Sequence, residues 1–436
     1  MLFGRGVTRV VQFVAFLILA RSLSPAAFGW FGVLTTAIAL AATLGNLGLR
    51  QSFAYEIGQQ RLTPGQAAGT SLVLWPVLSL VSAAIIFVIY GERIEGLAPN
   101  LAALIIFLGV AGAILLSLFQ GIFLGKGAIW AFSLSEALPR VLFVIGVVVL
   151  ALTARVTLVN ALWLQVGTFV VALPAIAFFA LWGSGKLGTV LRRLRPMLNY
   201  GLIFAFNLFL VTLSSRLSLL VIESSLGASA AGQFFAAVRV HEIFLEVASA
   251  LGMVLFANAV RSNDQASAIN RGVRAASLLF WFFMVIAVVV ILLAPLILTL
   301  LLGDSYADAA PVLQILALGL APTAAAKMLY PSIAGAGHPY FGTPVIFVSL
   351  VMNGALALLL VPAVGVAGGA IALVIGQYVL LLGYAITSRA RFGIPLHHLI
   401  VPRLSDVKSL KLNALTRRKR KGTGDPRAGA EIHDGE

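Results

Sequence analysis

The stretch AASLLFWFFMVIAVVVILLAPLILTLLL, residues 275–302, decides the fold class. It contains no charged residue, and it exceeds the roughly 20 helical residues that cross a hydrocarbon core about 30 Å thick. Its apolar residues do not alternate with polar ones, which argues against a strand of a membrane barrel. We therefore expect a membrane-spanning helix here.

The same pattern recurs along the whole chain. Hydrophobic residues make up 60% of it and charged residues 10%, against about 45–50% and about 25% in soluble proteins. This composition excludes a soluble enzyme, a disordered chain and, without cysteine, a disulfide-stabilised secreted domain. We predict an all-α, polytopic membrane protein with twelve transmembrane helices, at about residues 4–22, 28–48, 66–90, 97–123, 132–153, 158–182, 199–222, 230–257, 275–302, 309–334, 341–361 and 366–387. The first run could also be a signal peptide, but eleven further runs favour a first span.

The positions of the basic residues predict the orientation. Most of the 30 Lys and Arg lie in alternate loops or in the tail, whereas Arg21, Arg93 and Arg155 lie on the opposite side. By the positive-inside rule, both termini should be cytoplasmic. This placement also argues against nucleic acid as a partner. The basic cluster at residues 417–421 is interpreted as an anchor on anionic lipid, with docking of a partner as the alternative.

An internal repeat relates the two halves of the chain. At an offset that drifts from 203 to 210, the matches include Gly29 with Gly232, Phe31 with Phe234 and Gly125 with Gly335. Six spans separate the copies, so both have the same orientation, as in transporters built from parallel repeats. We predict an N-terminal six-helix lobe over 1–190, a C-terminal six-helix lobe over 191–390, a central cavity between them and a disordered basic tail over 391–436.

Polar residues within the predicted spans are the candidate functional residues. A charge near the bilayer centre costs at least about 2.5–3.5 kcal/mol, so it usually faces a bundle interior or a wet cavity. Glu242 and Glu246 share a helix face with an arginine and are candidates for coupling to a proton or Na⁺ gradient. The candidate substrate-binding residues are Arg9, Gln12, Arg140, Arg216, Arg239 and Lys327. Cations prevail in this set, and arginine suits phosphate oxygens, so we expect an anionic headgroup.

Simple neutralisation is the alternative for several of these charges. Glu136 and Arg140 are spaced i, i+4, and Arg239 and Glu242 are spaced i, i+3, so each pair could form an ion pair within its helix. Arg216 or Lys327 could likewise pair with Glu242 or Glu246 on a neighbouring helix. His241 lies on another face and is interpreted as packing rather than as a proton carrier.

Motifs for catalysis are missing from the sequence. It has no G-x-x-x-x-G-K-[ST] stretch, no H-E-x-x-H and no clustered histidines. The loops expected outside are too short to hold the paired carboxylates of a membrane glycosyltransferase or polymerase. We therefore predict a transporter, not an enzyme, with no cofactor and no metal.

Several stretches in series carry a family resemblance: LARSLSPAAFGWFGVL (19–34), GNLGLRQSFAYEIG (45–58), RVHEIFLEVASALGMVLFANAV (239–260), LLGDSYADAAPVLQILALG (301–319), IAGAGHPYFGTPV (333–345) and LVPAVGVAGGAIA (360–372). The chain resembles the polysaccharide flippases of the multidrug/oligosaccharidyl-lipid/polysaccharide exporter superfamily, such as O-antigen flippases. The resemblance implies two six-helix lobes around a cationic cavity. It also implies outward transport of undecaprenyl-diphosphate-linked oligosaccharide across the bacterial inner membrane, for lipopolysaccharide or exopolysaccharide synthesis.

The resulting prediction is an alternating-access flippase. Its expected partners are the lipid-linked oligosaccharide, membrane lipids and polysaccharide polymerase or assembly proteins. An inside-negative membrane potential would favour outward movement of a negative headgroup. The first alternative is an ion-coupled multidrug or toxin exporter of the same superfamily, which would need an acidic cavity for cationic drugs. A membrane glycosyltransferase or polymerase and a non-transporting scaffold fit the sequence less well.

Overall fold

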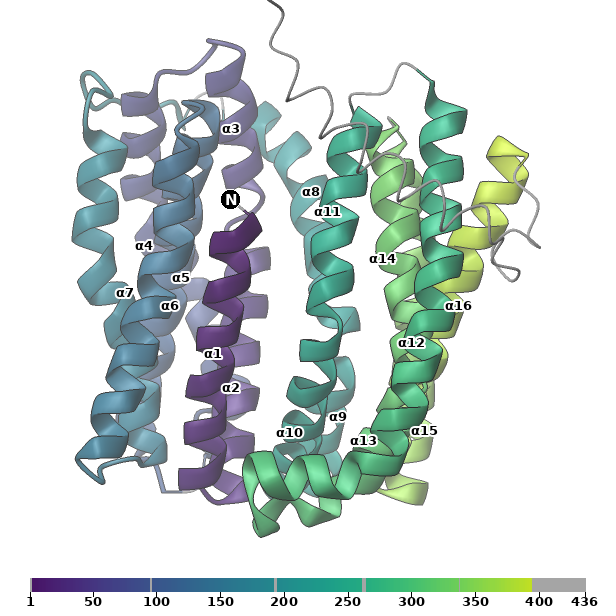
Figure 1. The fold of residues 1–436 in the computed structure, drawn as a ribbon. Helices are drawn as coiled ribbons and strands as arrows, with labels where there is room; N and C mark the ends of the chain where they lie inside the picture. The colour runs from purple at the N-terminus through teal and green to yellow at the C-terminus, as the bar shows by residue number, and fades with distance from the viewer. Residues whose placement is uncertain (1, 95, 192–193, 261–263, 337, 394–436) are drawn as a thin grey trace, which may run out of the picture.

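The structure, a computed structural model, describes residues 2–94, 96–191, 194–260, 264–336 and 338–393 (Figure 1). It does not describe the side chains of residues 2–11, 200, 257, 260, 265, 266 and 339. Within these ranges all regular structure is helical, which confirms the all-α class. The predicted tail lies outside the described residues from residue 394 onward.

The first half of the chain forms seven helices: α1 (Leu2–Ser22), α2 (Pro25–Gly45), α3 (Leu49–Gly58), α4 (Pro64–Tyr90), α5 (Pro99–Gly125), α6 (Ile129–Leu152) and α7 (Leu158–Leu181). The second half forms α8 (Leu194–Ser214), α9 (Leu217–Leu226), α10 (Ala228–Phe244), α11 (Glu246–Val260), α12 (Gln265–Leu302), the short helix η2 (Asp304–Ala309), α13 (Ala310–Ala317), α14 (Leu320–Gly335), the short helix η3 (Pro339–Phe341), α15 (Gly342–Val364) and α16 (Val366–Phe392).

Local signals in the sequence set where some helices begin. The Ser24 hydroxyl accepts a hydrogen bond from the Ala27 amide, and a proline follows directly at the first position of α2. Thr63 and Gln66 form a reciprocal capping box at the start of α4, again with a proline in the first turn. Such caps satisfy amide groups that the first helical turn leaves without partners.

The membrane character of the chain is clear from its helices. In the described part, nine helices are long and apolar enough to cross a membrane, or ten if η2–α13 and α14, bent by 48°, form one span. The other two predicted spans correspond to α1 and to the α10–α11 pair, which are not among these nine or ten helices. A polytopic membrane protein is therefore established by length and composition, and the number twelve stays a prediction.

We call α1–α7 the N-terminal lobe and α8–α16 the C-terminal lobe, after the predicted division of the chain, which stays a prediction. Contact between the lobes is most extensive where α2 packs on α10, and α8 also contacts α2 and α3. Figure 1 shows the lobes meeting at the end where α2 and α10 begin and diverging toward the end where α1 begins. We call the meeting end the closed end.

Two glycines make the contact at the closed end very close. A β-carbon on Gly29 of α2 would lie 1.9 Å from the Ala228 carbonyl oxygen, and one on Gly232 of α10 would lie 1.9 Å from the Pro25 carbonyl oxygen. The internal repeat matches these two glycines with each other. The closed end is therefore a contact between equivalent positions of the two halves, and it requires residues without a side chain.

Two sets of polar contacts between the lobes lie at the same end, whereas Ser52 Oγ of α3 donates a hydrogen bond to the Met197 carbonyl oxygen of α8, at 2.7 Å, near the other end. The Arg93 guanidinium pairs with the Glu223 carboxylate of α9 at 3.0 Å, and that carboxylate side chain is only 2% exposed. Arg21 of α1 donates from Nε to the Leu301 carbonyl oxygen of α12 at 2.9 Å and from Nη2 to the Leu300 carbonyl oxygen. Each bond joins the N-terminal lobe to the C-terminal lobe.

Candidate functional site

One carboxylate between two arginines forms the polar centre of the site. Glu242 Oε1 lies 3.0 Å from Arg216 Nη2, and Glu242 Oε2 lies 3.0 Å from Arg239 Nη1. The three side chains are 31%, 17% and 34% exposed, respectively, so they are neither sealed in the core nor open to lipid on all sides. With two cations and one anion, the triad carries a net positive charge.

Interruptions in two helices place this triad. Span seven breaks between α8 and α9, and Arg216 occupies the N-cap of α9 in a non-helical conformation. Span eight breaks at Leu245, directly after the turn of α10 that carries Arg239 and Glu242. Broken helices within spans commonly build ion and substrate sites in transporters, because backbone polar groups are freed beside a cavity.

Arg216 keeps one unused donor group. Its Nη1 atom is buried and has no hydrogen-bond partner among the described atoms. A buried guanidinium donor without a partner is costly, so an anion oxygen or a water molecule bound there would be stabilised.

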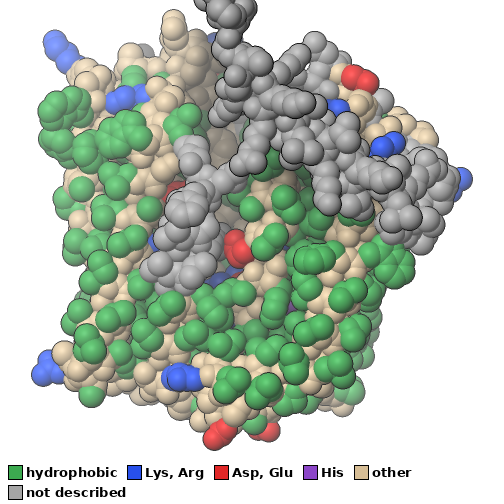
Figure 2. Space-filling model, in the orientation of Figure 1, with side chains coloured by type: hydrophobic (Ala, Val, Ile, Leu, Met, Phe, Trp, Pro, Cys, Tyr) green, Lys and Arg blue, Asp and Glu red, His purple; other side chains and the backbone are tan. Residues whose placement is uncertain are grey.

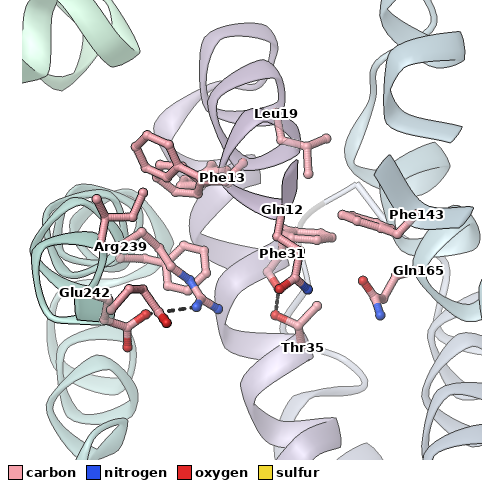
Figure 3. Close-up of a pocket in the computed structure, with 14 residues that line it drawn as sticks. Gln12, Phe13, Leu19, Phe31, Thr35, Phe143, Gln165, Arg239 and Glu242 are labelled. Carbon is pink, nitrogen blue, oxygen red and sulfur yellow. Dashed lines mark hydrogen bonds and ion pairs between the residues drawn. The ribbon is translucent and has the colours of Figure 1, made fainter. Parts of the chain in front are cut away.

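A cavity of about 230 Å³ lies between the lobes beside the triad. In Figure 3, Arg239 and Glu242 face the cavity from α10, while Gln12, Thr35 and Gln165 face it from α1, α2 and α7. Phenylalanines supply most of the remaining wall: Phe13, Phe16, Phe28, Phe31, Phe143 and Phe235. We call this space the inter-lobe cavity.

The two lobes contribute different chemistry to the inter-lobe cavity. All of its described charged lining residues, which are Arg239, Glu242 and Glu246, come from the C-terminal lobe. The N-terminal lobe contributes amides, one hydroxyl and aromatic rings. On the C-terminal side, the Arg239 guanidinium lies over the Phe235 ring, 4.8 Å from its centroid, and this cation–π contact holds the side chain at the wall. In the face shown in Figure 2, acidic and basic atoms are visible between the two apolar lobes.

The structure distributes the predicted site residues over several places. It brings Gln12, Arg239, Glu242 and Glu246 together at the inter-lobe cavity and joins Arg216 to them through Glu242. Lys327 lines a different cavity, inside the C-terminal lobe. Arg140 is half-buried on α6 and is not among the described residues that line the inter-lobe cavity. The Arg9 side chain lies outside the described part of the structure.

Some site residues were not predicted from the sequence. The phenylalanine wall and Gln165 belong to runs that read only as apolar spans. Gln165 could have been found as an amide one to two turns inside span six. The phenylalanines carry no such signal, because Phe is common in any membrane span.

Metal binding has no support in the described part of the chain, where no group of three or more His, Cys, Asp or Glu side chains could hold a metal ion. The site offers a pair of arginines on one carboxylate beside an aromatic cavity. Such a pair can bind an anion if the carboxylate moves aside, since guanidinium groups bind carboxylate and phosphate oxygens in the same geometry.

Comparison with known families places the chain in one of them. Residues 1–256 match the family described as "Polysaccharide biosynthesis protein". The chain belongs to this family. No curated protein sequence matches it closely enough to count as a relative.

Solved structures show the fold of this family member. An inward-facing multidrug resistance MATE transporter of the MOP superfamily is similar with a TM-score of 0.65 and 20% identity, over 89% of this chain and 98% of the other. The lipid II flippase MurJ in an inward closed conformation is similar with a TM-score of 0.69 and 14% identity, over 95% of this chain and 92% of the other. A MOP superfamily transporter from Pyrococcus furiosus, whose binding pocket is described as having reverse polarity, is similar with a TM-score of 0.64 and 20% identity. The match covers 90% of this chain and 94% of the other. The chain therefore has the fold of these MOP-superfamily structures.

Proposed function

We propose that the protein is a flippase for lipids whose headgroup is a diphosphate-linked saccharide, with undecaprenyl-diphosphate-linked oligosaccharide as the substrate. The observation that carries this proposal is the pair of arginines, Arg216 and Arg239, held on Glu242. Arg239 and Glu242 line the inter-lobe cavity, and Arg216 is joined to it through Glu242. The family's description, polysaccharide biosynthesis, supports a saccharide cargo. The likeness to the lipid II flippase supports the fold for moving a lipid-linked cargo.

In this proposal Glu242 occupies the place of the substrate anion while the cavity is empty. The diphosphate displaces the carboxylate, binds both guanidinium groups and satisfies the unused Nη1 donor of Arg216. Glu242, released from its partners, is then the candidate group for carrying a coupling proton. Together with Glu246 on the same wall, it would couple transport to a proton or Na⁺ gradient.

Alternating access follows from the shape of the molecule. The closed end, sealed by Gly29, Gly232 and the Arg93–Glu223 pair, would face outward, and the diverging end would face the cytoplasm. Both termini would then be cytoplasmic, in the inner membrane of a bacterium. An inside-negative potential would favour outward release, by about 2.3 kcal/mol per charge per 100 mV for a charge that crosses the whole field. Polymerase or assembly proteins that consume the flipped glycan are the expected partners.

Reconstituted vesicles test the proposal. The purified protein is placed in proteoliposomes with a fluorescent undecaprenyl-diphosphate sugar, and transport is measured as loss of accessibility to a quencher. We expect Arg216→Gln and Arg239→Gln each to lower the rate about 10- to 150-fold, the equivalent of one charged hydrogen bond of about 1.5–3 kcal/mol. The matched control is Arg155→Gln, which removes an exposed arginine from a loop at the closed end. Undiminished transport in both cavity variants would refute the role of the triad.

A second candidate function is export of amphipathic cations. Six phenylalanines and Glu246 line the same cavity, and aromatic rings with a carboxylate suit a cationic drug. This exporter predicts that Glu246→Gln raises the drug sensitivity of cells while transport of a lipid-linked sugar is absent from the wild type. A drug panel and the vesicle assay, run side by side, separate the two functions.

A further inference from the structure

A second and larger cavity lies inside the C-terminal lobe. Its volume is about 960 Å³, within the range of pockets that hold drug-sized ligands. Segments of α8, α11, α14, α15 and α16 surround it, and we call it the C-lobe cavity. Its described lining residues do not include Arg216, Arg239 or Glu242, so the proposed binding of a diphosphate leaves this space without a role.

The C-lobe cavity is elongated along the spans. Its wall runs from Thr323 to Ala334 on α14 and from Leu373 to Tyr384 on α16, and these two helices pack against each other. Each stretch is about 16 Å long at 1.5 Å per residue, so the volume corresponds to a mean width of about 8 Å. A space about twice as long as it is wide suits an extended chain better than a rounded molecule.

Most of the accessible wall of this cavity is apolar. The rings of Tyr330 and Tyr384 belong to it and lie stacked with their centroids 5.5 Å apart. Such a surface favours hydrocarbon over a hydrated solute. Apolar side chains from α8, α11, α15 and α16 contribute further, among them Val211, Met253, Phe256, Ile346, Leu373 and Leu380.

The polar groups of the wall offer a ligand little. The Ser249 and Ser349 hydroxyls donate to backbone carbonyl oxygens at 3.0 and 2.7 Å. The Asn353 amide donates to one backbone carbonyl oxygen and accepts from a serine hydroxyl. Thr323 Oγ1 and Gln377 Oε1 have no partner among the described atoms, but both atoms are buried and do not reach the surface of the cavity. The interior of the C-lobe cavity is therefore a place for a hydrocarbon chain.

Lys327 adds a single charge to this apolar wall. It is the only charged residue among the described residues that line the C-lobe cavity. It lies on α14, one turn from Thr323 and one turn from Tyr330, within the tenth predicted span. A charged side chain within a span is costly and usually marks a bound ion or substrate. A ligand with an acidic group gains from the lysine, whereas a cationic ligand loses.

The C-lobe cavity is open on the side of α8 and α11. Val211 of α8 and Met253 and Phe256 of α11 line it and are 47%, 37% and 43% exposed. The two helices pack mainly on other neighbours, α8 on α3 and α15, and α11 on α14. Figure 1 shows both on the side of the C-terminal lobe that faces the N-terminal lobe. A chain can therefore enter between them from that side.

We propose that the C-lobe cavity binds a long-chain anionic lipid of the surrounding membrane, with its chain along α14 and α16 and its acidic end beside Lys327. The chemistry of this ligand is that of a fatty acid, which combines one hydrocarbon chain with one negative charge. The site is separate from the arginine triad, and the proposal does not depend on the proposed function.

Binding of a fluorescent fatty acid tests the proposal. The probes are cis-parinaric acid and its methyl ester, which has the same chain without the charge. Each is titrated into the purified full chain in detergent, and energy transfer from tryptophan is measured against micelles alone. We expect the wild type to bind the acid about tenfold more tightly than the ester.

Two variants separate the lysine from the cavity. Lys327→Met keeps the length of the side chain and removes its charge, so it should weaken binding of the acid about tenfold and change that of the ester less than twofold. Its matched control is Lys186→Met, at an exposed position outside the cavity. Ala334→Phe fills the cavity and should weaken both probes about tenfold, whereas Leu358→Phe, at a 64%-exposed position of α15, should weaken neither. Thermal unfolding shows whether each variant is folded.

Three results would overturn the proposal. Equal binding of acid and ester by the wild type, or unchanged binding of the acid by Lys327→Met, would show that the lysine does not hold the acidic end. Unchanged binding by a folded Ala334→Phe protein would place the probes on the outer surface. Displacement of the acid by an equimolar amount of undecaprenyl diphosphate would make the cavity part of the cargo site instead.

A photolabel locates the ligand without any variant. A long-chain fatty acid with a diazirine on its chain, added to the wild type in vesicles of neutral lipid, should label the peptides of α14 and α16 that carry Tyr330 and Tyr384. Labelling confined to exposed residues of α15, such as Leu358 and Leu359, would place the chain outside the lobe and contradict the assignment.

Discussion

Replacing Gly29 by alanine should force the closed end apart. The new β-carbon would lie 1.9 Å from the Ala228 carbonyl oxygen, whereas ordinary contact begins at 3.4 Å. The backbones of α2 and α10 must therefore separate locally by about 1.5 Å. Overpacking of this kind costs about 1–3 kcal/mol, and a conformation that separates the two helices avoids the cost. We expect the equilibrium to move about 5- to 150-fold toward an opening at this end.

Spin labels measure this shift directly, because the chain has no cysteine of its own. One label pair, at Arg155→Cys and Asp308→Cys, reports on the closed end from exposed positions of the two lobes. A second pair, at Gln59→Cys and Arg389→Cys, reports on the diverging end. In Gly29→Ala the first distance should increase and the second should decrease. The control is Gly167→Ala, since a β-carbon there meets nothing within 4 Å.

An unchanged distance distribution in a folded Gly29→Ala protein would refute the reasoning. It would mean that α2 and α10 yield locally, without rotation of the lobes. A shift of the same size in Gly167→Ala would also refute it, because the effect would then come from the loss of a helical glycine rather than from contact between the lobes.

Three further predictions concern polar groups. Arg93→Ala should lower the free energy of unfolding by about 1–3 kcal/mol, since the 2%-exposed Glu223 carboxylate loses its partner. Arg93→Ala/Glu223→Gln should recover part of this in a thermal-unfolding assay. A double variant no better than the single one would contradict the pairing. Asn353→Leu should lower the free energy of unfolding by about 1–3 kcal/mol in the same assay, because Ser218 Oγ and the Ser214 carbonyl oxygen lose their hydrogen-bond partner. The control is Met352→Leu, at an exposed neighbouring position, which should change stability little. Glu242→Gln should tighten the binding of inorganic pyrophosphate, because Arg216 and Arg239 lose the carboxylate that pairs with them. Calorimetry at low salt measures this affinity. Equal or weaker binding would show that Glu242 does not compete with the ligand.

The sequence was sufficient for the fold class and for the ion pairing. Long uncharged runs such as residues 275–302 can only be membrane helices, and the i, i+3 spacing of Arg239 and Glu242 predicts the pair that the structure shows. Interhelical pairing of Arg216 with Glu242 was also among the alternatives, and it is present at 3.0 Å. These features follow from local spacing or from the high energy of an unpaired charge in a span.

The helix breaks and the cavities could not be predicted in the same way. Leu245, where span eight breaks, has neither glycine nor proline beside it, so no local signal marks the break. Lys327 was assigned to a single central cavity shared with the arginines, whereas it lines a separate space. Which side of a helix faces a cavity depends on the packing of distant spans, and periodicity is weak in helices that are apolar all round.

The uneven division of charge between the lobes has a consequence for the transport cycle. Among the described residues at the inter-lobe cavity, every charge is attached to the C-terminal lobe. If the lobes rock as rigid units, a bound anion would travel with one of them throughout the stroke, and the aromatic half would slide past it as a neutral partner. An ancestral duplication would then have produced a carrier and a counter-surface from a single scaffold. Changes in the first half should tune the speed of the stroke, and changes in the second half should decide which cargo is accepted.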